Sequence, residues 1–225
     1  MKKTILAVIL LAVATVTTVI AQESARNFQY DLNEAGNGIV ITKYIGSNSN
    51  LVIPRTIEGY PVVEIGSLYG EGDRIVPDNF LVSLVIPEGV RIIGMRAFNN
   101  QKNLTSVTLP STLKDIGRNA FEYSGLRTVR IPDSVENIWD SAFGQSRNLT
   151  DVNIPVSIKR IGVYAFYDCK MLSNLTIPAS IKSIRWWGGG WDDTSSEYDA
   201  FSGCALTLAA RRRLVELGYS SDGFR

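Results

Sequence analysis

The feature that most constrains this chain is a repeat of 22 or 23 residues that runs through its centre. Each copy opens with leucine and a short alternating segment, turns at a proline, resumes an apolar pattern and closes on an Ala-Phe pair. The prolines of five successive copies, spaced by 23, 22, 23 and 23 residues, are Pro87, Pro110, Pro132, Pro155 and Pro178. A period of this length, with leucine or isoleucine at fixed offsets, predicts a stacked solenoid whose coils bury each other's apolar sides.

Two extended segments are predicted in every coil. In residues 126–131, Val129 and Ile131 face one way, whereas Thr128 and Arg130 face the other. Proline ends this strand because it has no N–H to donate, and a second segment returns on the opposite side of the coil. The Ala-Phe pairs are predicted to stack one aromatic ring per coil in an interior column made by Phe98, Phe121, Phe143, Phe166 and Phe201. The predicted fold class is therefore a mainly β solenoid with parallel strands.

The chain is predicted to have four parts: a signal peptide (residues 1–21), an N-terminal β cap (22–50), the repeat solenoid (51–205) and a C-terminal cap helix with its tail (206–225). Residues 33–38 are rich in asparagine and glycine between two alternating segments, which predicts a β-hairpin. Thr207 is a candidate N-cap of the helix and Gly218 its stop. The hairpin and the helix are expected to cover the two apolar ends of the stack.

The first residues have the pattern of an export signal. Lys2 and Lys3 precede an apolar run over residues 4–20, and Ala21 offers a small residue for cleavage. The alternative is an uncleaved membrane anchor, but the run of 17 residues is short for a bilayer core that needs about 20. We therefore expect an exported protein, at the cell surface, secreted or periplasmic, with no stable membrane span after cleavage.

Composition excludes several classes of function. The chain has no histidine, which removes Ser-His-Asp and Cys-His catalysis and histidine metal sites. The formal net charge of +1 gives no basic field for nucleic acid. Carboxylates such as Asp115 and Glu136 fall at solvated repeat positions with no nucleophile–base pair, so neither an enzyme nor a cofactor is predicted. Cys169 and Cys204 occupy equivalent places in adjacent coils, and we expect buried thiols, although the spacing also permits a disulfide.

The repeat pattern LxxVxIPxSVxxIGxxAFxxCxx resembles that of the BspA-like leucine-rich repeat family of bacterial surface and secreted proteins. The resemblance covers residues 51–205, and residues 28–46 are similar to the N-terminal region of spirochaetal members. It implies a leucine-rich repeat solenoid of parallel strands with a binding or adhesion role and no catalysis. Two positions depart from the pattern, because Trp139 and Arg185 stand where the repeat carries glycine, and a 12-residue insertion interrupts the last copy.

The outward side chains of the first strand in each coil form a candidate binding strip. Ser83 and Val85 begin two rows, which continue through Ser106, Thr108, Thr128, Arg130, Asp151, Asn153, Asn174 and Thr176. Strands about 4.8 Å apart would pave a strip about 20 Å long, a surface of the kind that solenoids offer to extended partners. The alternative is an ordinary polar sheet face, in which Arg130 and Asp151 form only a cross-strand ion pair.

A tryptophan-rich insertion is the second candidate. It contains Trp186, Trp187 and Trp191, and the fourth tryptophan, Trp139, lies two copies earlier at the position equivalent to Arg185. We expect Trp139, Trp187 and Trp191 to form an aromatic patch for a partner, since tryptophan is favoured at binding hot spots. The alternative is that the tryptophans seal the last coil, as we expect for Trp186. A calcium site is not favoured, because no EF-hand spacing fits the insertion's acidic residues, Asp192, Asp193, Glu197 and Asp199.

These observations predict an exported leucine-rich repeat protein that mediates protein–protein binding or adhesion, with a host or neighbouring-cell protein as its ligand. A different class of function stays open. The protein could instead be a structural or assembly component of the cell envelope that binds other envelope proteins.

Overall fold

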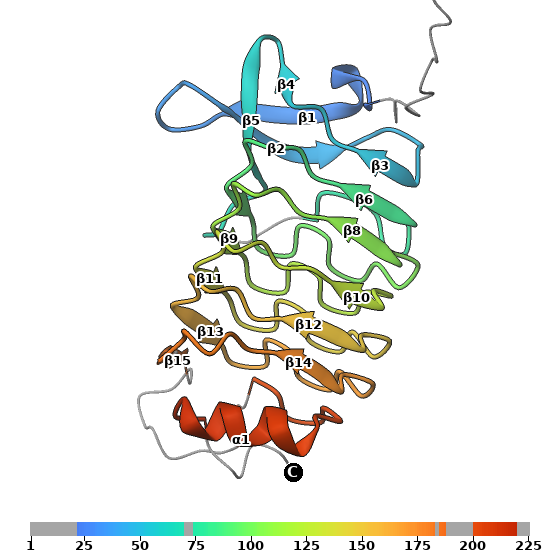
Figure 1. Cartoon of the computed structure of the whole chain (residues 1–225). Helices are drawn as coiled ribbons and strands as arrows, with labels where there is room; N and C mark the ends of the chain where they lie inside the picture. The colour runs from blue at the N-terminus through green and yellow to red at the C-terminus, as the bar shows by residue number, and fades with distance from the viewer. Residues whose placement is uncertain (1–21, 70–73, 183–184, 188–199, 220–225) are drawn as a thin grey trace, which may run out of the picture.

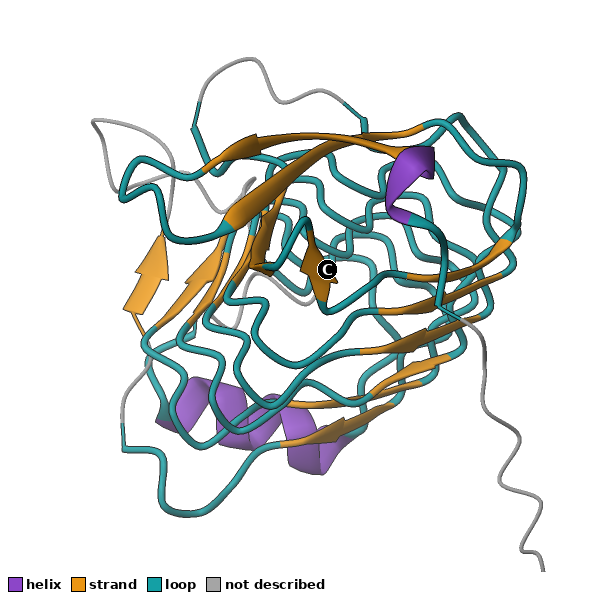
Figure 2. Ribbon diagram, turned by 90° about the horizontal axis from the view of Figure 1, so that it is seen from above, coloured by secondary structure: helices purple, strands orange, loops and turns teal. Residues whose placement is uncertain are grey.

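The chain forms a solenoid of stacked coils, with strands on two sides of every coil and loops between them (Figures 1 and 2). The computed structural model describes residues 22–69, 74–182, 185–187 and 200–219, and at 185–187 it describes the backbone alone. The predicted signal peptide, Trp191 and the acidic residues of the insertion lie outside the described residues. The predicted fold class, a mainly β leucine-rich repeat solenoid with a hairpin at one end and a helix at the other, is confirmed.

One side of the stack is a continuous sheet, called here the return sheet. Its strands follow one another in the order β1-β2-β5-β7-β9-β11-β13-β15, and every pair after the β1–β2 hairpin is parallel. The strands are β1 (Phe28–Leu32), β2 (Ile39–Tyr44), β5 (Tyr60–Ile65), β7 (Ile92–Ile93), β9 (Asp115–Ile116), β11 (Asn137–Ile138), β13 (Arg160–Gly162) and β15 (Arg185–Trp187). The short β4 (Thr56–Ile57) pairs antiparallel with β5.

The opposite side of the stack carries the front strands. They are β3 (Asn50–Val52), β6 (Ser83–Val85), β8 (Ser106–Thr108), β10 (Thr128–Val129), β12 (Asp151–Asn153) and β14 (Asn174–Thr176). The first three form one parallel sheet and the last three another, so the hydrogen-bonded ladder is interrupted between β8 and β10. The interruption follows the single 22-residue coil, in which one residue fewer separates Phe121 from Leu126 than separates Phe98 from Leu104.

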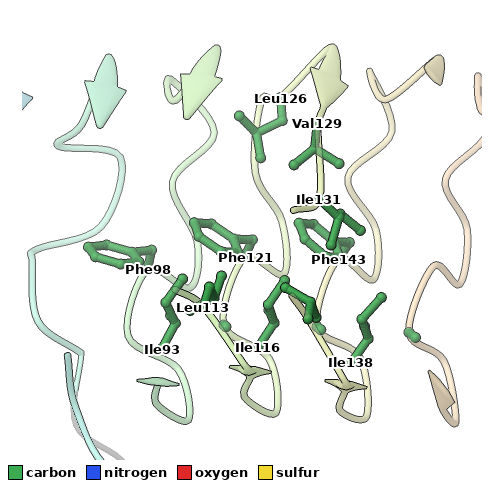
Figure 3. Close-up of a cluster of buried hydrophobic side chains, with 14 of the residues drawn as sticks. Ile93, Phe98, Leu113, Ile116, Phe121, Leu126, Val129, Ile131, Ile138 and Phe143 are labelled. Carbon is green, nitrogen blue, oxygen red and sulfur yellow. The ribbon is translucent and has the colours of Figure 1, made fainter. Parts of the chain in front are cut away.

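The interior contains the predicted aromatic column. Consecutive rings from Phe98 to Phe201 lie 5.1–5.5 Å apart between centroids, with interplanar angles of 6–19°. Each of these rings is fully buried. Figure 3 shows the rings of Phe98, Phe121 and Phe143 between front-side chains such as Val129 and return-side chains such as Ile116. Because no coil can bury its own ring, the stack shares one continuous core.

A third side, called here the turn side, connects each return strand to the next front strand. It uses two left-handed residues in each of the four coils around Phe98, Phe121, Phe143 and Phe166, for example Asn119 (φ 56°) and Tyr123 (φ 58°). In this conformation the N–H groups of residues 119, 121 and 123 all donate to carbonyls of the following coil, at 2.7–3.0 Å. The coils around Phe98 and Phe143 repeat the same three bonds. The backbone of the turn side is thus hydrogen-bonded from coil to coil.

Both ends of the stack are covered. At the N-terminal end, Asn33 Oδ1 accepts hydrogen bonds from the N–H groups of Asn37 and Gly38 and shapes the tip of the β1–β2 hairpin. At the other end, helix α1 (Leu208–Glu216) begins at Thr207, whose side chain accepts from the N–H of Ala210 at 3.3 Å, as predicted. Its buried residues are Ala210 and Leu214.

The residue that completes the aromatic column is Tyr219. Its ring meets Phe201 edge-on, with centroids 5.7 Å apart. Its hydroxyl accepts a hydrogen bond from the N–H of Phe201 at 3.0 Å, where an earlier coil would offer the carbonyl of an alanine. Gly218 was predicted to end the helix, and the contact of Tyr219 beyond it was not predicted.

The two cysteines are free, buried thiols, as expected. Cys169 Sγ donates to the carbonyl of Phe143 at 3.2 Å, and Cys204 Sγ donates to that of Phe166 at 3.0 Å. Burial raises the pKa of the Cys169 thiol well above its ordinary value, and the neighbouring Cys204 adds to the effect. Both thiols therefore act as small core side chains that satisfy carbonyls between coils.

Candidate binding surface

The predicted strip exists on the front strands, in two separate parts. Ser106 and Thr108 lie in register with Ser83 and Val85 on the first front sheet. On the second sheet, Thr128, Asp151 and Asn174 form one row, and Asn153 and Thr176 form part of the other. The polar rows therefore run as predicted, with the ladder interrupted between Thr108 and Thr128.

The second part of the strip is occupied by hydrogen bonds between its own side chains. Arg130 Nη1 lies 2.6 Å from Asp151 Oδ1, so the predicted cross-strand ion pair forms. Asn174 Nδ2 donates to the other carboxylate oxygen of Asp151. The side chain of Asp151 is only 16% exposed, whereas that of Arg130 is 70% exposed. Within this ion pair, the guanidinium group of Arg130 is therefore the part that faces solvent.

Asn153 has a structural role that the sequence did not indicate. Its Oδ1 accepts from the N–H of Ile131 at 2.8 Å, and its Nδ2 donates to the carbonyl of the same residue at 2.7 Å. At the equivalent place in the next coil the bond is made by the backbone, from the N–H of Ile154 to the carbonyl of Thr176. An amide side chain thus replaces a ladder contact next to the interruption. It is not available to a partner without breaking both bonds.

Three exposed hydroxyl groups of the strip lie next to the interruption. Ser106, Thr108 and Thr128 are all exposed there, on β8 and β10. Arg130 adjoins them on the same side of the stack. These four residues form an exposed group at the interruption, and Thr176 adds a further exposed hydroxyl at the far end of the second front sheet. Exposed residues of both front sheets therefore meet at the interruption.

Trp139 lies on the return side and does not join this strip. Its indole Nε1 donates to Asp115 Oδ1 at 3.1 Å, and Asn137 Nδ2 donates to the same oxygen at 2.9 Å. The guanidinium carbon of Arg160 sits 4.9 Å from the centre of the indole ring, a cation–π contact. Trp139 is half-buried and held by neighbours in the coils on either side. Its role in this position is to join adjacent coils.

The predicted equivalence of Trp139 with Arg185 is wrong. β15 pairs with β13 so that Arg185 is opposite Arg160 and Trp187 is opposite Gly162. Because Asn137 pairs with Arg160, Arg185 is aligned with Asn137. Trp187 is then aligned with the residue after Ile138, which is Trp139. A shift of two residues keeps every side chain on its original face, so the alternation of apolar residues could not reveal this shift in register. The backbone of Trp187 therefore shares a column with Trp139, and its side chain lies outside the described residues.

The carboxylates weighed as catalytic groups have structural partners. Asp115 accepts from Trp139 and Asn137, and Glu136 lies between Lys114 and Lys159 at 3.1 and 2.5 Å. Hydrogen bonds from Lys159 and then Lys114 lower the pKa of Glu136, which keeps it ionised. In the described part of the chain no group of three or more metal-ligating side chains comes together.

Sequence reasoning missed a hollow on the turn side. It has a volume of about 510 Å³ and is lined by Lys102, Tyr123, Gly125, Gln145, Arg147 and Asn148. A smaller hollow of about 290 Å³ adjoins it and shares Gln145. The larger one opens where the 22-residue coil lacks a residue, so the irregular spacing was the signal that could have located it.

Comparison with known proteins agrees with the coil geometry. Residues 78–187 match the model of the BspA type leucine rich repeat region in six copies. The chain is a BspA-type leucine-rich repeat protein. This family is a non-enzymatic repeat scaffold, typical of bacterial surface proteins. No curated protein matches the chain. Along the described residues, no helix has the length and apolar character needed to cross a membrane.

Solved structures of bacterial leucine-rich repeat proteins resemble this BspA-type protein. A leucine-rich repeat protein of T. pallidum is 28% identical over 89% of this chain and 97% of that chain, with a TM-score of 0.61. A leucine-rich cell surface protein of Faecalibacterium prausnitzii is 33% identical over 80% of this chain, with a TM-score of 0.62. This chain spans 46% of the Faecalibacterium protein. The pneumococcal vaccine antigen PcpA, at 17% identity and a TM-score of 0.50, shares the fold.

Proposed function

We propose that this BspA-type protein is exported and binds a protein ligand, from a host or a neighbouring cell, through the front strip. The observation that carries the proposal is the group of exposed hydroxyls and the guanidinium at the interruption: Ser106, Thr108, Thr128 and Arg130. Their backbones are fixed by parallel ladders and by the core beneath them, so a partner meets a rigid surface and loses little entropy in ordering it.

Arg130 is the residue of this strip best suited to recognition. The carboxylate of Asp151 holds its guanidinium in place, while 70% of the side chain remains exposed. Arginine is enriched at interface hot spots because its fixed donors match carboxylates and carbonyl groups. A partner surface with acidic and carbonyl groups fits this arrangement. Trp187 and Trp191 remain proposed contributors from the return side and from outside the described residues, respectively.

Export is supported by the family and by the relatives. The lysines and apolar run at the N-terminus have the pattern of a signal peptide, and one similar structure is named a cell surface protein. Protease treatment of intact cells tests this part, because a surface protein is digested and a protected one is not. Protection would redirect the proposal to a role in envelope assembly.

The binding proposal is tested by matched charge reversals on opposite sides of the stack. Proteins of the intact cell surface are captured on the chain from residue 22 onward and identified, and the affinity of each purified candidate is then measured. Arg130→Glu should weaken binding by roughly tenfold or more, the loss of one charge-assisted contact. Arg91→Glu makes the same change at an exposed return-side position and should leave binding unaltered. Equal loss in both variants, or none in either, would contradict the proposal.

A further inference from the structure

The turn-side hollow is formed by two local features of the 22-residue coil. The fourth residue after the core phenylalanine is Lys102, Gly125, Arg147 and Lys170 in successive coils. Glycine therefore replaces a basic residue in the 22-residue coil alone among these four. The fifth residue is Asn103 in the first of these coils and Asn148 in the third, and Gly125 leads directly to Leu126. Side-chain volume is therefore missing at two consecutive positions, between neighbours that retain it.

Glycine is required at residue 125 by a close backbone approach. A Cβ atom built on Gly125 would lie 2.1 Å from the carbonyl oxygen of Lys102, far inside contact distance. The short coil is thus drawn against the coil before it, and the space opens toward the coil after it, where Gln145 and Asn148 line it. The hollow is a fixed consequence of the fold.

Polar groups in the hollow are held in place before any ligand arrives. Arg147 lies 2.7 Å from Asp168 Oδ2 through Nη2, and the same nitrogen donates to Gln145 Oε1 at 3.3 Å. Lys102 lines the same hollow as Gln145 and Arg147, and Tyr123 lines it from the coil between them. The Tyr123 side chain is 37% exposed, which leaves part of its ring open to a ligand. Two cations, two amides and an aromatic ring therefore line one space.

The adjoining hollow extends the same surface to the next coil. It is lined by Glu122, Ser141, Gly144, Gln145, Tyr164 and Tyr167. The rings of Tyr164 and Tyr167 meet edge-on with centroids 5.1 Å apart. Glu122 accepts from Asn99 and Asn119, each at 2.9 Å, and its own position is fixed by them. Together the two hollows give one elongated surface with a cationic end and a tyrosine end.

The chemistry of this surface matches sugar rings better than a polypeptide. The N–H groups of Tyr123 and Gln145 already donate to carbonyls of the following coils, so a peptide cannot add as a strand. Among the described residues that line the two hollows none is aliphatic, so no apolar side-chain pocket is available. Amides, hydroxyls and phenol groups supply donors and acceptors for hydroxyl groups, and the tyrosine faces offer flat apolar area. The volumes are those of small-ligand sites.

We infer that the turn side of this protein binds an acidic oligosaccharide, with a uronate carboxylate between Lys102 and Arg147 and a neighbouring ring against Tyr164 and Tyr167. This site lies apart from the front strip of the proposed function, and either can fail without the other. The carboxylate would replace solvent around two cations, of which Arg147 is already oriented by Asp168.

The inference is tested by titration calorimetry of the chain from residue 22 onward with hexasaccharides of polygalacturonate, hyaluronan and chondroitin. We expect binding to at least one of them, weakened by roughly tenfold or more when its carboxyls are reduced to alcohols. Raising the salt concentration should weaken binding further, because the contact is ionic. Absence of heat with all three chains, or equal affinity for the carboxyl-reduced form, would overturn the inference. An equal affinity for polyglutamate would show a general anion surface and would overturn it too.

Matched variants locate the site. Lys102→Glu and Tyr123→Ala should each reduce affinity for the bound hexasaccharide by roughly tenfold. Lys43→Glu, at an exposed position of β2 outside the hollow, and Tyr60→Ala, an exposed tyrosine near the N-terminal end, should not. Insertion of asparagine after Gly125 restores the 23-residue spacing and should abolish binding while thermal unfolding stays cooperative. Retained binding in that insertion variant would place the sugar elsewhere.

Discussion

The return sheet and the front strands respond differently to the same irregular coil. The return sheet continues through β9 and β11, which pair across 22 residues as evenly as β7 and β9 pair across 23. On the front side, the ladder stops between β8 and β10. The missing residue lies between Phe121 and Leu126, after the return strand and just before the front strand, so its effect falls on the front. The return sheet and the phenylalanine column fix the stacking, and the front side and the turn side absorb irregularity.

The largest effect is expected in the column that both sides share. Phe121→Ala removes a fully buried ring from between Phe98 and Phe143, and the stack on either side limits collapse of the cavity. The free energy of unfolding should fall by about 3–5 kcal/mol, measured by urea denaturation. Tyr123→Ala, two residues along on the exposed turn side, should change it by less than about 1 kcal/mol. Similar losses in the two variants would contradict the shared column.

A smaller loss is expected at the short coil itself. Gly125→Ala places a Cβ atom against the carbonyl oxygen of Lys102, a backbone group that cannot move without shifting the coil. Unfolding free energy should fall by about 1–3 kcal/mol, the usual range for overpacking. Gly144→Ala serves as control, because its nearest contact would be at 3.2 Å and needs little adjustment. A neutral Gly125→Ala would mean that the coils are not drawn together at this point.

The front side offers a sharper comparison between two neighbouring polar residues. Asn153→Ala removes both hydrogen bonds from its side chain to the backbone of Ile131. The N–H and the carbonyl group of Ile131 then lose the partners that replace a ladder contact. We expect a loss of about 1–3 kcal/mol. Arg130→Ala breaks an exposed ion pair and should cost about 0–1 kcal/mol. Equal losses in chemical denaturation would show that Asn153 does not stand in for the interrupted ladder.

The smallest effect concerns the pH dependence contributed by Glu122 on the turn side. Burial raises its pKa, although hydrogen bonds from Asn119 and Asn99 oppose the shift. A carboxyl whose pKa is raised on folding stabilises the protein below its ordinary value of 4.5, and this contribution is lost as pH rises through the raised pKa. The stability of the wild type relative to Glu122→Gln should therefore decrease as pH rises from about 4 to 7.

Glu88 provides the control of opposite sign. The hydrogen bond from the N–H of Ser111 lowers the pKa of Glu88, so its contribution is present at neutral pH and lost on acidification. The stability of the wild type relative to Glu88→Gln should therefore increase with pH over the acid range. Parallel pH trends for the two variants would show that the turn-side carboxyl is not desolvated.

The regular part of the fold was predictable because each coil repeats the same pattern of buried and exposed residues. Alternation placed Val129 and Ile131 inside and Thr128 outside, and the spacing of Ala-Phe pairs predicted the column. Thr207 was identifiable as a cap because its hydroxyl type and position meet a requirement of every helix start. These features depend on local sequence or on strict periodicity, and both are readable from one chain.

The features that could not be predicted depend on contacts between coils at irregular points. The spacing of 22 residues was visible, but not that the front ladder would stop while the return sheet continued. Asn153 was placed on the binding strip by its face, and its bonds to Ile131 depend on the interruption beside it. Trp139 was grouped with the insertion by residue type and by its expected equivalence with Arg185, whereas Asp115 and Arg160 determine where its ring lies. Position on a face was predictable, and the partner of each side chain was not.

The left-handed residues have an electrostatic consequence for the turn side. In each of the coils around Phe98, Phe121 and Phe143, three N–H groups point toward the C-terminal neighbour, so the peptide dipoles of this side add along the axis. The positive pole of that column falls at the last coil. There the hydroxyl of Tyr219 accepts a hydrogen bond from the N–H of Phe201. The turn side therefore gains polarity with every coil, and the group that covers its C-terminal end must supply an electron pair.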